Sequence, residues 1–211
     1  MKVSFLTLVK TLLKSVIRPL LMSDLPSVVV ASPGRSGSTV IFEALVAGMA
    51  KKRFGLSYRY LNGLVRCEAW RLSSCILRAG YVYKTHDLPS KNLWVGNTKT
   101  IFVFGDVVDT VTSVISCQER FGRDWVEEHL KHLNASGKMS DILDKDILQI
   151  SEQLGSWFEA DDLDLMLVHY EAIWEPGFNE LLSKFVGFKA ELPEFRGRSE
   201  KTALSDLEAL R

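Results

Sequence analysis

A short stretch rich in glycine and serine is the best-defined candidate for chemistry in this chain. It covers Ser32–Thr39, between a β-branched run at Ser27–Ala31 and an apolar segment with helical spacing from Val40. Gly34 and Gly37 allow a tight turn. Backbone amides at the start of a helix, together with the helix dipole, attract anions. We therefore predict that this segment, the glycine–serine loop, holds a phosphate or sulfate group.

The side chains of the loop add charge and donors to the predicted site. Arg35 supplies a full positive charge, and the hydroxyl groups supply further hydrogen bonds. The predicted ligands are Pro33, Gly34, Arg35, Ser36, Gly37, Ser38 and Thr39. The ATPase pattern GxxxxGK[ST] is absent, because the second glycine comes too early and no lysine follows it. The alternative is a strand–turn–helix connection whose small residues serve packing alone.

A second candidate segment reads Lys-Thr-His-Asp at positions 84–87 and ends a predicted strand. His86 suits the removal of a proton from an attacking hydroxyl or amine, because imidazole titrates near neutral pH. Lys84 and Arg35 can offset charge on a transferred group. Asp87 is an alternative base, or a residue that orients His86. A histidine that only packs at a strand end is the further alternative.

These segments resemble the sulfotransferases that use 3′-phosphoadenosine 5′-phosphosulfate, over roughly residues 27–190. Carbohydrate and bacterial members commonly carry Pro-Arg-Ser-Gly-Ser-Thr or Pro-Arg-Ser-Gly-Ser-Ser in the loop that binds the 5′-phosphosulfate. In this chain Gly34 stands between the proline and the arginine. The Lys-Thr-His segment is similar to the one that carries the catalytic base in cytosolic-type members. The resemblance implies that His86 is the base.

A third segment, Thr100–Ser116, resembles the part of the family that binds the 3′-phosphate, where a strand precedes Arg-Asp-Pro-Arg-Asp and a helical serine. By that match, Asp106 and Asp109 occupy the acidic positions, Asp106 is a donor ligand, and Ser113 binds the 3′-phosphate. Gly105 stands where the first arginine is expected, and glycine cannot replace an arginine fork. Another basic residue could reach in, the donor could lack a 3′-phosphate, or the protein could bind without catalysis.

The basic residues available for that role are Arg120, Arg123, Arg196, Arg198 and Lys201. The segment Phe195–Ser199 is similar to the basic, glycine-containing loop that closes over the donor, which implies Arg196 and Arg198 as donor ligands. A solvated tail is the alternative. His169 falls in an apolar strand and is predicted to be a buried core residue. His129 and His132 lack a third metal ligand and are predicted to lie on the surface.

The resemblance implies transfer of a sulfuryl group from this nucleotide donor to a hydroxyl or amine acceptor, such as a carbohydrate or a small metabolite, without a metal. One alternative is a non-catalytic member that binds a nucleotide or a partner protein. The other is a nucleotide-dependent phosphotransferase, which the missing loop lysine disfavours. The acceptor loops, Arg53–Leu64 and Asp87–Thr98, carry no recognisable code.

Strands alternating with helices must position these residues. Strands are predicted at Ser27–Ala31, Tyr81–Lys84, Thr100–Phe104 and Leu163–Tyr170, and helices at Val40–Lys52, Leu64–Leu77, Val107–Phe121, Trp125–Leu133, Met139–Phe158 and Asn179–Val186. The alternation predicts one three-layer α/β domain over residues 25–211, with a central parallel sheet of about four or five strands and helices on both faces. The resemblance implies that this domain is P-loop NTPase-like. Ligands of such sheets bind beyond the carboxyl ends of the strands.

Composition narrows the classes of partner. Lys plus Arg and Asp plus Glu number 26 each, so no overall charge draws the 211-residue chain to nucleic acid, and none is expected as a partner. Cys67, Cys75 and Cys117 are odd in number and lack CxxC spacing. A disulfide framework and a zinc site are therefore not expected, which suits a cytoplasmic protein.

The first 24 residues predict an amphipathic helix. Lys10, Lys14 and Arg18 recur every four residues and lie along one face, opposite apolar residues at helical spacing. Lys10 and Lys14 interrupt the apolar centre that a signal peptide would need. The helix could lie on a membrane surface as a peripheral anchor, or dock on the domain or on a second subunit.

Overall fold

The computed structural model describes residues 24–194. The helix predicted over residues 1–24, apart from its last residue, and the predicted ligands Arg196 and Arg198 lie outside the described residues. Among the helices of this described part, none is both long and apolar enough to cross a membrane.

Five parallel strands form the central sheet, in the order β2-β3-β1-β4-β5. The strands are β1 (Ser27–Ala31), β2 (Arg66–Glu68), β3 (Val82–Thr85), β4 (Thr98–Phe104) and β5 (Leu165–His169). Every residue of β1 is buried, as expected of a β-branched strand at the centre of a sheet covered on both faces. The prediction of a parallel α/β sheet is confirmed.

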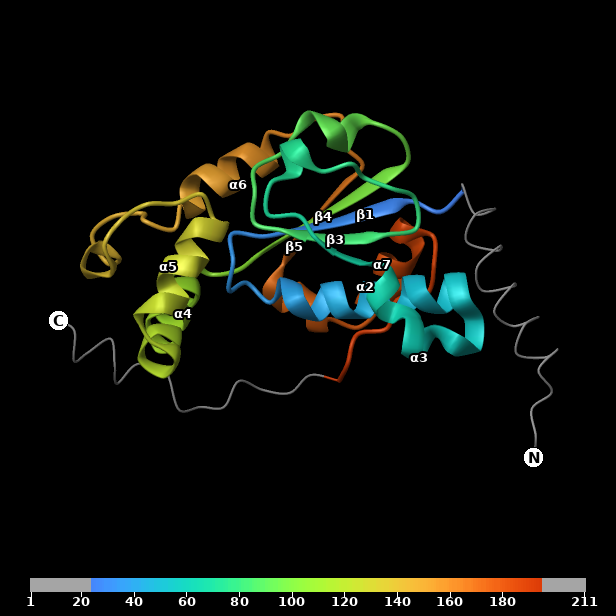
Figure 1. The fold of residues 1–211 in the computed structure, drawn as a ribbon, viewed down its shortest axis with the longest axis horizontal. Helices are drawn as coiled ribbons and strands as arrows, with labels where there is room; N and C mark the ends of the chain where they lie inside the picture. The colour runs from blue at the N-terminus through green and yellow to red at the C-terminus, as the bar shows by residue number, and fades with distance from the viewer. Residues whose placement is uncertain (1–23, 195–211) are drawn as a thin grey trace.

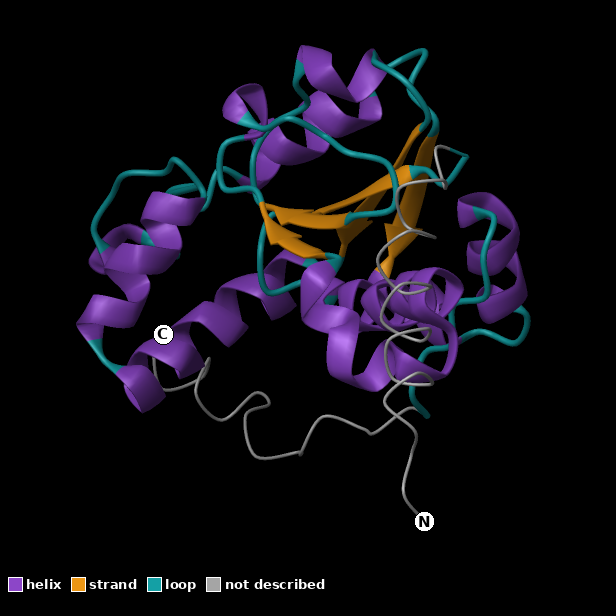
Figure 2. Ribbon diagram, turned by 45° about the vertical axis from the view of Figure 1, so that its right-hand side comes forward, coloured by secondary structure: helices purple, strands orange, loops and turns teal. Residues whose placement is uncertain are grey.

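Alternate residues of β1 pack into two different cores. Val28 and Val30 belong to a core shared with helices α2 (Ser38–Phe54) and α7 (Phe178–Val186). Val29 and Ala31 belong to a second core that contains Trp157 of α6 (Ile150–Phe158). Helices therefore cover both faces of the sheet (Figure 1 and Figure 2).

Two further helices stand beyond the carboxyl ends of the strands. They are α4 (Val107–Phe121) and α5 (Arg123–His132), which appear at the left of Figure 1, where β1 ends. Val114 of α4 and Val126 of α5 share a third core with the segment around Ile147. This unit places helical side chains next to the glycine–serine loop.

The helix predicted over Leu64–Leu77 is wrong. The segment contains the edge strand β2 and a 3-10 turn at Leu72–Ser74. Val65, Ala69 and Leu72 are all buried, and their spacing of four and three imitates a helix. Val65, however, packs in the α2 core, whereas Ala69 and Leu72 pack in the α6 core. Pairing with β3 overrides the helical pattern.

The helix predicted over Met139–Phe158 is too long. Only Ile150–Phe158 is α-helical, after a 3-10 turn at Met139–Asp141. The carboxylate of Asp146 accepts hydrogen bonds from the amides of Ile150 (2.9 Å) and Ser151 (2.8 Å). These bonds satisfy the first free amides and fix the start of α6.

Replacing two helical glycines with alanine should change the free energy of unfolding in opposite directions. A Cβ on Gly48 would collide with the backbone carbonyl oxygen of Lys189, whereas a Cβ on Gly155 would meet nothing within 4 Å. We expect Gly48→Ala to lower the free energy of unfolding by about 1–3 kcal/mol through overpacking. Gly155→Ala should raise it by about 0.5–1 kcal/mol.

Urea unfolding of the two variants measures both changes. A Gly48→Ala protein as stable as the wild type would show that α2 does not pack against the 188–190 segment as described.

Candidate functional site

The glycine–serine loop lies at the carboxyl edge of the sheet, where the strand order reverses. The connection from β1 leads to β2 on one side, and the connection from β4 leads to β5 on the other. Such a switch point is the usual ligand site of a parallel sheet. The hydroxyl of Ser36 donates to the carbonyl oxygen of Val103 in β4 (2.9 Å), which holds the loop across this position.

The loop presents the free start of α2. Gly37 is the N-cap residue with φ +78°, and no side chain caps the helix. The first turn also carries no acidic residue. Gly34 and Arg35 have φ of +83° and +54°. A left-handed conformation is unfavourable for arginine, and such strain concentrates at ligand sites. The first amides of α2 are therefore available to an anion.

Two of the three hydroxyl groups predicted to bind a ligand turn inward instead. The Ser36 hydroxyl is bonded to Val103, and the Ser38 hydroxyl lies 2.8 Å from that of Ser32. Both serines are buried. Their structural role is to hold the loop in shape. Pro33 is buried as well, whereas Arg35 and Thr39 are exposed.

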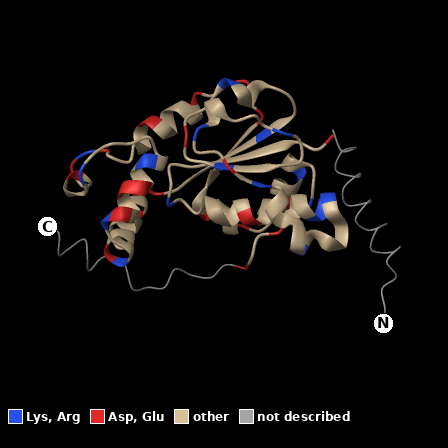
Figure 3. Ribbon diagram, viewed as in Figure 1, with Lys and Arg blue, Asp and Glu red and all other residues tan. Residues whose placement is uncertain are grey.

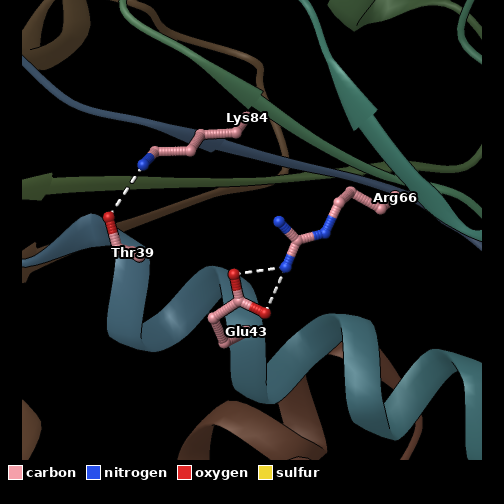
Figure 4. Close-up of polar contacts among 4 residues, drawn as sticks. All are labelled: Thr39, Glu43, Arg66 and Lys84. Carbon is pink, nitrogen blue, oxygen red and sulfur yellow. Dashed lines mark hydrogen bonds and ion pairs between the residues drawn. The ribbon is translucent and has the colours of Figure 1, made fainter. Parts of the chain in front are cut away.

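Lys84 reaches the loop from β3. Its ammonium group donates to the Thr39 hydroxyl oxygen at 2.8 Å (Figure 4). Arg66 of β2 pairs with Glu43 one turn further along α2. Burial lowers the pKa of Lys84, and the charges of Glu68 and Glu43 oppose that shift. Lys84 therefore brings a partly desolvated charge to the start of α2.

His86 is fixed directly against the loop. Its Nδ1 donates to the carbonyl oxygen of Ser32 (2.8 Å) and lies 3.1 Å from the Ser32 hydroxyl. This tautomer leaves Nε2 with a lone pair, as a general base requires. The side-chain amide of Gln153 in α6 donates to the His86 backbone carbonyl. Burial lowers the pKa of His86 to about 3, so the ring is neutral near pH 7.

Asp87 does not orient His86. One carboxylate oxygen accepts from the amide of Leu72 (2.9 Å), and the other accepts from the amide of Leu88 (2.9 Å). Asn134 contributes a longer contact of 3.4 Å. Asp87 therefore organises the loops around β2 and β3. The alternative in which Asp87 orients His86 is wrong, because the carbonyl oxygen of Ser32 orients the ring instead.

A ring cluster lies beside the loop and joins segments far apart in the sequence. It consists of Trp70, His86, Trp125, His129 and His132. Trp70 stacks on His132 with ring centroids 4.0 Å apart, and Trp125 stacks on His129 at 5.0 Å. The His86 and His129 rings meet edge to face at 6.1 Å.

His129 is the residue that sequence reasoning missed, because it was expected on the surface. Its residue surface is only 8% exposed. Its Nε2 is buried and has no hydrogen-bond partner among the described residues. A Cβ placed on Gly34 would lie 2.7 Å from its Cε1 and 3.1 Å from its Nε2. The glycine between Pro33 and Arg35 thus gives His129 access to the loop.

His129, like His86, is neutral near pH 7. Burial lowers its pKa to about 4, with further lowering by Arg35, His132 and Lys84. The signal that could have identified it is the placement of Trp125 and His129 four residues apart on one helix face. That spacing predicts a stacked pair, but it does not show which way the pair faces.

Arg35 points away from the loop toward α4. Its Nε donates to the hydroxyl of Ser113 (3.0 Å), and its guanidinium carbon lies 5.8 Å from the Trp125 ring centroid. The structure therefore brings together Arg35 and Ser113, two residues predicted to bind the donor. Asp106, a third, is the N-cap residue of α4, where its carboxylate accepts from the amide of Asp109 (3.0 Å).

Other predicted residues lie elsewhere. The side chain of His169 is 42% exposed and faces Glu171 at 4.0 Å, so its placement in the core is wrong, because it ends the edge strand β5. Arg123 pairs with Glu127 on the solvent-exposed side of α5. Among the described residues, no group of three or more His, Cys, Asp or Glu side chains is arranged to hold a metal ion.

A cavity of ≈ 640 Å³ lies between α4 and the 142–154 segment. Val107, Val108 and Val111 of α4 line it. Ser113 lies two residues beyond Val111, which is more than half a turn around a helix. The cavity is therefore on a different face of α4 from the Arg35–Ser113 contact.

Comparison with known proteins does not assign the chain to a family: no family model matches it, and no curated protein matches it.

The two buried histidines should make stability depend on pH. Both are neutral in the folded protein, with pKa values lowered to about 3 and about 4. The unfolded chain takes up these protons as the pH falls below about 6.5, so stability decreases between about pH 6.5 and pH 4. Each histidine should contribute a slope of up to about 1.4 kcal/mol per pH unit.

Urea unfolding of the wild type and His129→Gln across that range measures the slope. The variant should be less sensitive to acid, whereas His169→Gln, at a half-exposed site, should behave as the wild type. Equal slopes in wild type and His129→Gln would contradict the burial of His129.

Proposed function

We propose that this chain is a sulfotransferase with a P-loop NTPase-like fold, which takes the sulfuryl group from 3′-phosphoadenosine 5′-phosphosulfate. One observation carries the proposal: Lys84 and His86, two residues apart at the end of β3, both contact the glycine–serine loop. A cation and a neutral imidazole therefore converge on the free start of a helix. This is the set of groups that transfer of a sulfuryl group to a hydroxyl or amine needs.

In the proposed reaction, the acceptor oxygen or nitrogen attacks sulfur in line with the oxygen that joins sulfur to the 5′-phosphate. The new bond to sulfur forms as the old sulfur–oxygen bond breaks, and 3′-phosphoadenosine 5′-phosphate leaves. Nε2 of His86 accepts the acceptor's proton. The amides of Gly37, Ser38 and Thr39 and the Lys84 ammonium hold the anionic oxygens. Positioning and charge stabilisation supply most of the rate, as in phosphoryl transfer.

Burial lowers the pKa of His86, and a base with a lowered pKa accepts a proton less readily. A bound donor brings negative charge next to the ring, and a nearby anion favours the protonated form of histidine. The same charge favours protonation of His129, whose buried Nε2 has no hydrogen-bond partner within residues 24–194. The donor's charge would therefore raise the pKa of both imidazoles, which would make His86 a stronger base toward the acceptor's proton.

Arg35 could replace the arginine that the resemblance expects at position 105, where this chain has a glycine. Its Nε donates to the hydroxyl of Ser113, the residue that the family resemblance assigns to the 3′-phosphate, and this contact supports a role for Arg35 there. Arg35 would then serve the 3′-phosphate end of the donor, and Lys84 the sulfuryl end. The cation–π contact with Trp125 helps to hold Arg35 in this direction.

Calorimetric titration with 3′-phosphoadenosine 5′-phosphate, adenosine 5′-phosphate and ATP with magnesium tests the donor. We expect the compound with the 3′-phosphate to bind most tightly. Arg35→Ala should weaken it by about 10- to 100-fold, the value of a charge-assisted hydrogen bond, and should remove its advantage over adenosine 5′-phosphate.

Arg123→Ala is the matched control, because Arg123 pairs with Glu127 in solvent. Tightest binding of ATP with magnesium would favour the phosphotransferase alternative. Binding that is indifferent to the 3′-phosphate would contradict the proposed donor.

Gly105→Arg restores the arginine that the resemblance expects. A Cβ at Gly105 would meet only the Cβ of Tyr170, at an ordinary 3.5 Å. The variant should therefore fold, and it should bind 3′-phosphoadenosine 5′-phosphate about tenfold more tightly, with no such gain for adenosine 5′-phosphate. Phe121→Arg adds the same charge at the exposed far end of α4 and is the control. Equal gains for both nucleotides would show that Gly105 does not face the 3′-phosphate.

A further inference from the structure

A second feature lies where the chain leaves α2 and folds back on it. The short turns η1 (Gly55–Ser57), α3 (Tyr58–Leu61) and η2 (Asn62–Leu64) follow one another there. Phe54, Tyr58 and Val65 recur at helical spacing and pack against the core of α2 and α7. The opposite face of such a helical segment is expected to be polar.

That outward face is apolar instead. Leu56 is 100% exposed, Tyr60 90% and Leu64 59%. One lies in each of the three consecutive turns, so three large apolar side chains are exposed within nine residues, and we call these three the apolar row. A row of large apolar residues in solvent is uncommon on a soluble domain unless it contacts a partner or a membrane.

Basic residues surround this row. Residues 44–67 include five basic side chains and no acidic one: Lys51, Lys52, Arg53, Arg59 and Arg66. Three of the five are engaged: Arg53 donates to the carbonyl of Gly80 (2.8 Å), Arg66 pairs with Glu43, and Arg59 donates to the hydroxyl of Tyr58 (3.3 Å). Lys51, Lys52 and Arg59 are exposed around the apolar row. The nearby Glu191 is paired with Lys189 and also interacts with Lys51.

These residues lie at the far end of the molecule from the candidate site. α2 begins at the glycine–serine loop and ends at Phe54, and its 17 residues span about 25 Å. Figure 1 shows α3 at the end opposite α4 and α5, and Figure 3 shows basic ribbon at the end of α2. Elsewhere along the described chain, Figure 3 shows acidic and basic residues interspersed.

We propose that Leu56, Tyr60 and Leu64, with Lys51, Lys52 and Arg59, form a docking surface for an anionic lipid bilayer. We call this set the α3 corner. The apolar side chains would enter the boundary between headgroups and acyl chains, and the basic side chains would pair with lipid phosphates. The tyrosine suits the same depth, because its ring is apolar and its hydroxyl is polar.

The side chains favour lipid over nucleic acid as the partner. Nucleic acids reward aromatic stacking and arginine contacts, whereas the aliphatic Leu56 and Leu64 would gain little there. A bilayer rewards both aliphatic burial and basic charge. Docking at this corner leaves the glycine–serine loop open, because the two lie at opposite ends of α2. The inference does not depend on the proposed sulfotransferase activity.

Co-sedimentation of the full chain with vesicles tests the proposal. We expect binding to vesicles of phosphatidylcholine mixed with phosphatidylglycerol, weaker binding to pure phosphatidylcholine, and loss of binding as salt rises. Leu56→Ser/Tyr60→Ser/Leu64→Ser should weaken binding at least tenfold. Lys51→Glu/Lys52→Glu should weaken it by about fivefold or more for each charge, and it alters no packed residue.

The matched control is Val108→Ser/Phe121→Ser/Leu143→Ser, which removes three exposed apolar residues outside the corner. It should bind vesicles as the wild type does. Wild-type binding by both corner variants would overturn the proposal and would point to residues 1–23 instead. Corner variants that bind vesicles as the wild type does, but no longer bind a single-stranded oligonucleotide that the wild type binds, would also overturn it. The two corner variants should bind nucleotides with unchanged affinity, which separates this test from that of the proposed function.

Discussion

The contact between Ser32 and His86 is the constraint on which the candidate site depends. β1 and β3 are parallel neighbours in register, with Ala31 opposite Thr85, so the residues that follow the two strands must meet. The Ser32 carbonyl then fixes the tautomer of His86, and the Ser32 hydroxyl lies within 2.8 Å of that of Ser38 at the start of α2. One buried position thereby couples the loop, the imidazole and the helix.

Around this contact, the titratable groups that are buried are neutral, and the charged groups lie nearer to solvent. The buried imidazoles of His86 and His129 are neutral, because burial lowers both pKa values. The cations lie at the margin, with Lys84 on Thr39 and Arg35 on Ser113. The site therefore combines neutral imidazoles in its interior with cations at its edge.

The polarity of α2 connects its two ends to two different surfaces. Its first turn has no acidic residue and no side-chain cap, so the positive end of the helix dipole is left for an anion. Its last turn carries Lys51, Lys52 and Arg53, which complement the negative end. The same lysines add charge to the α3 corner. A single helix thus connects the candidate anion site at one end with a basic, apolar surface at the other.

The sequence by itself determined the parallel α/β sheet, the place of the glycine–serine loop after β1, and most of the helices, because these depend on local periodicity and on glycine. It could not determine β2, because Val65, Ala69 and Leu72 repeat like a helix while facing two cores. It also could not place His129 beside Gly34 or Arg35 on Ser113. Those contacts arise only when α4 and α5 fold over the carboxyl edge of the sheet. The tertiary structure alone decided them, because side chains so far apart in sequence meet only through packing.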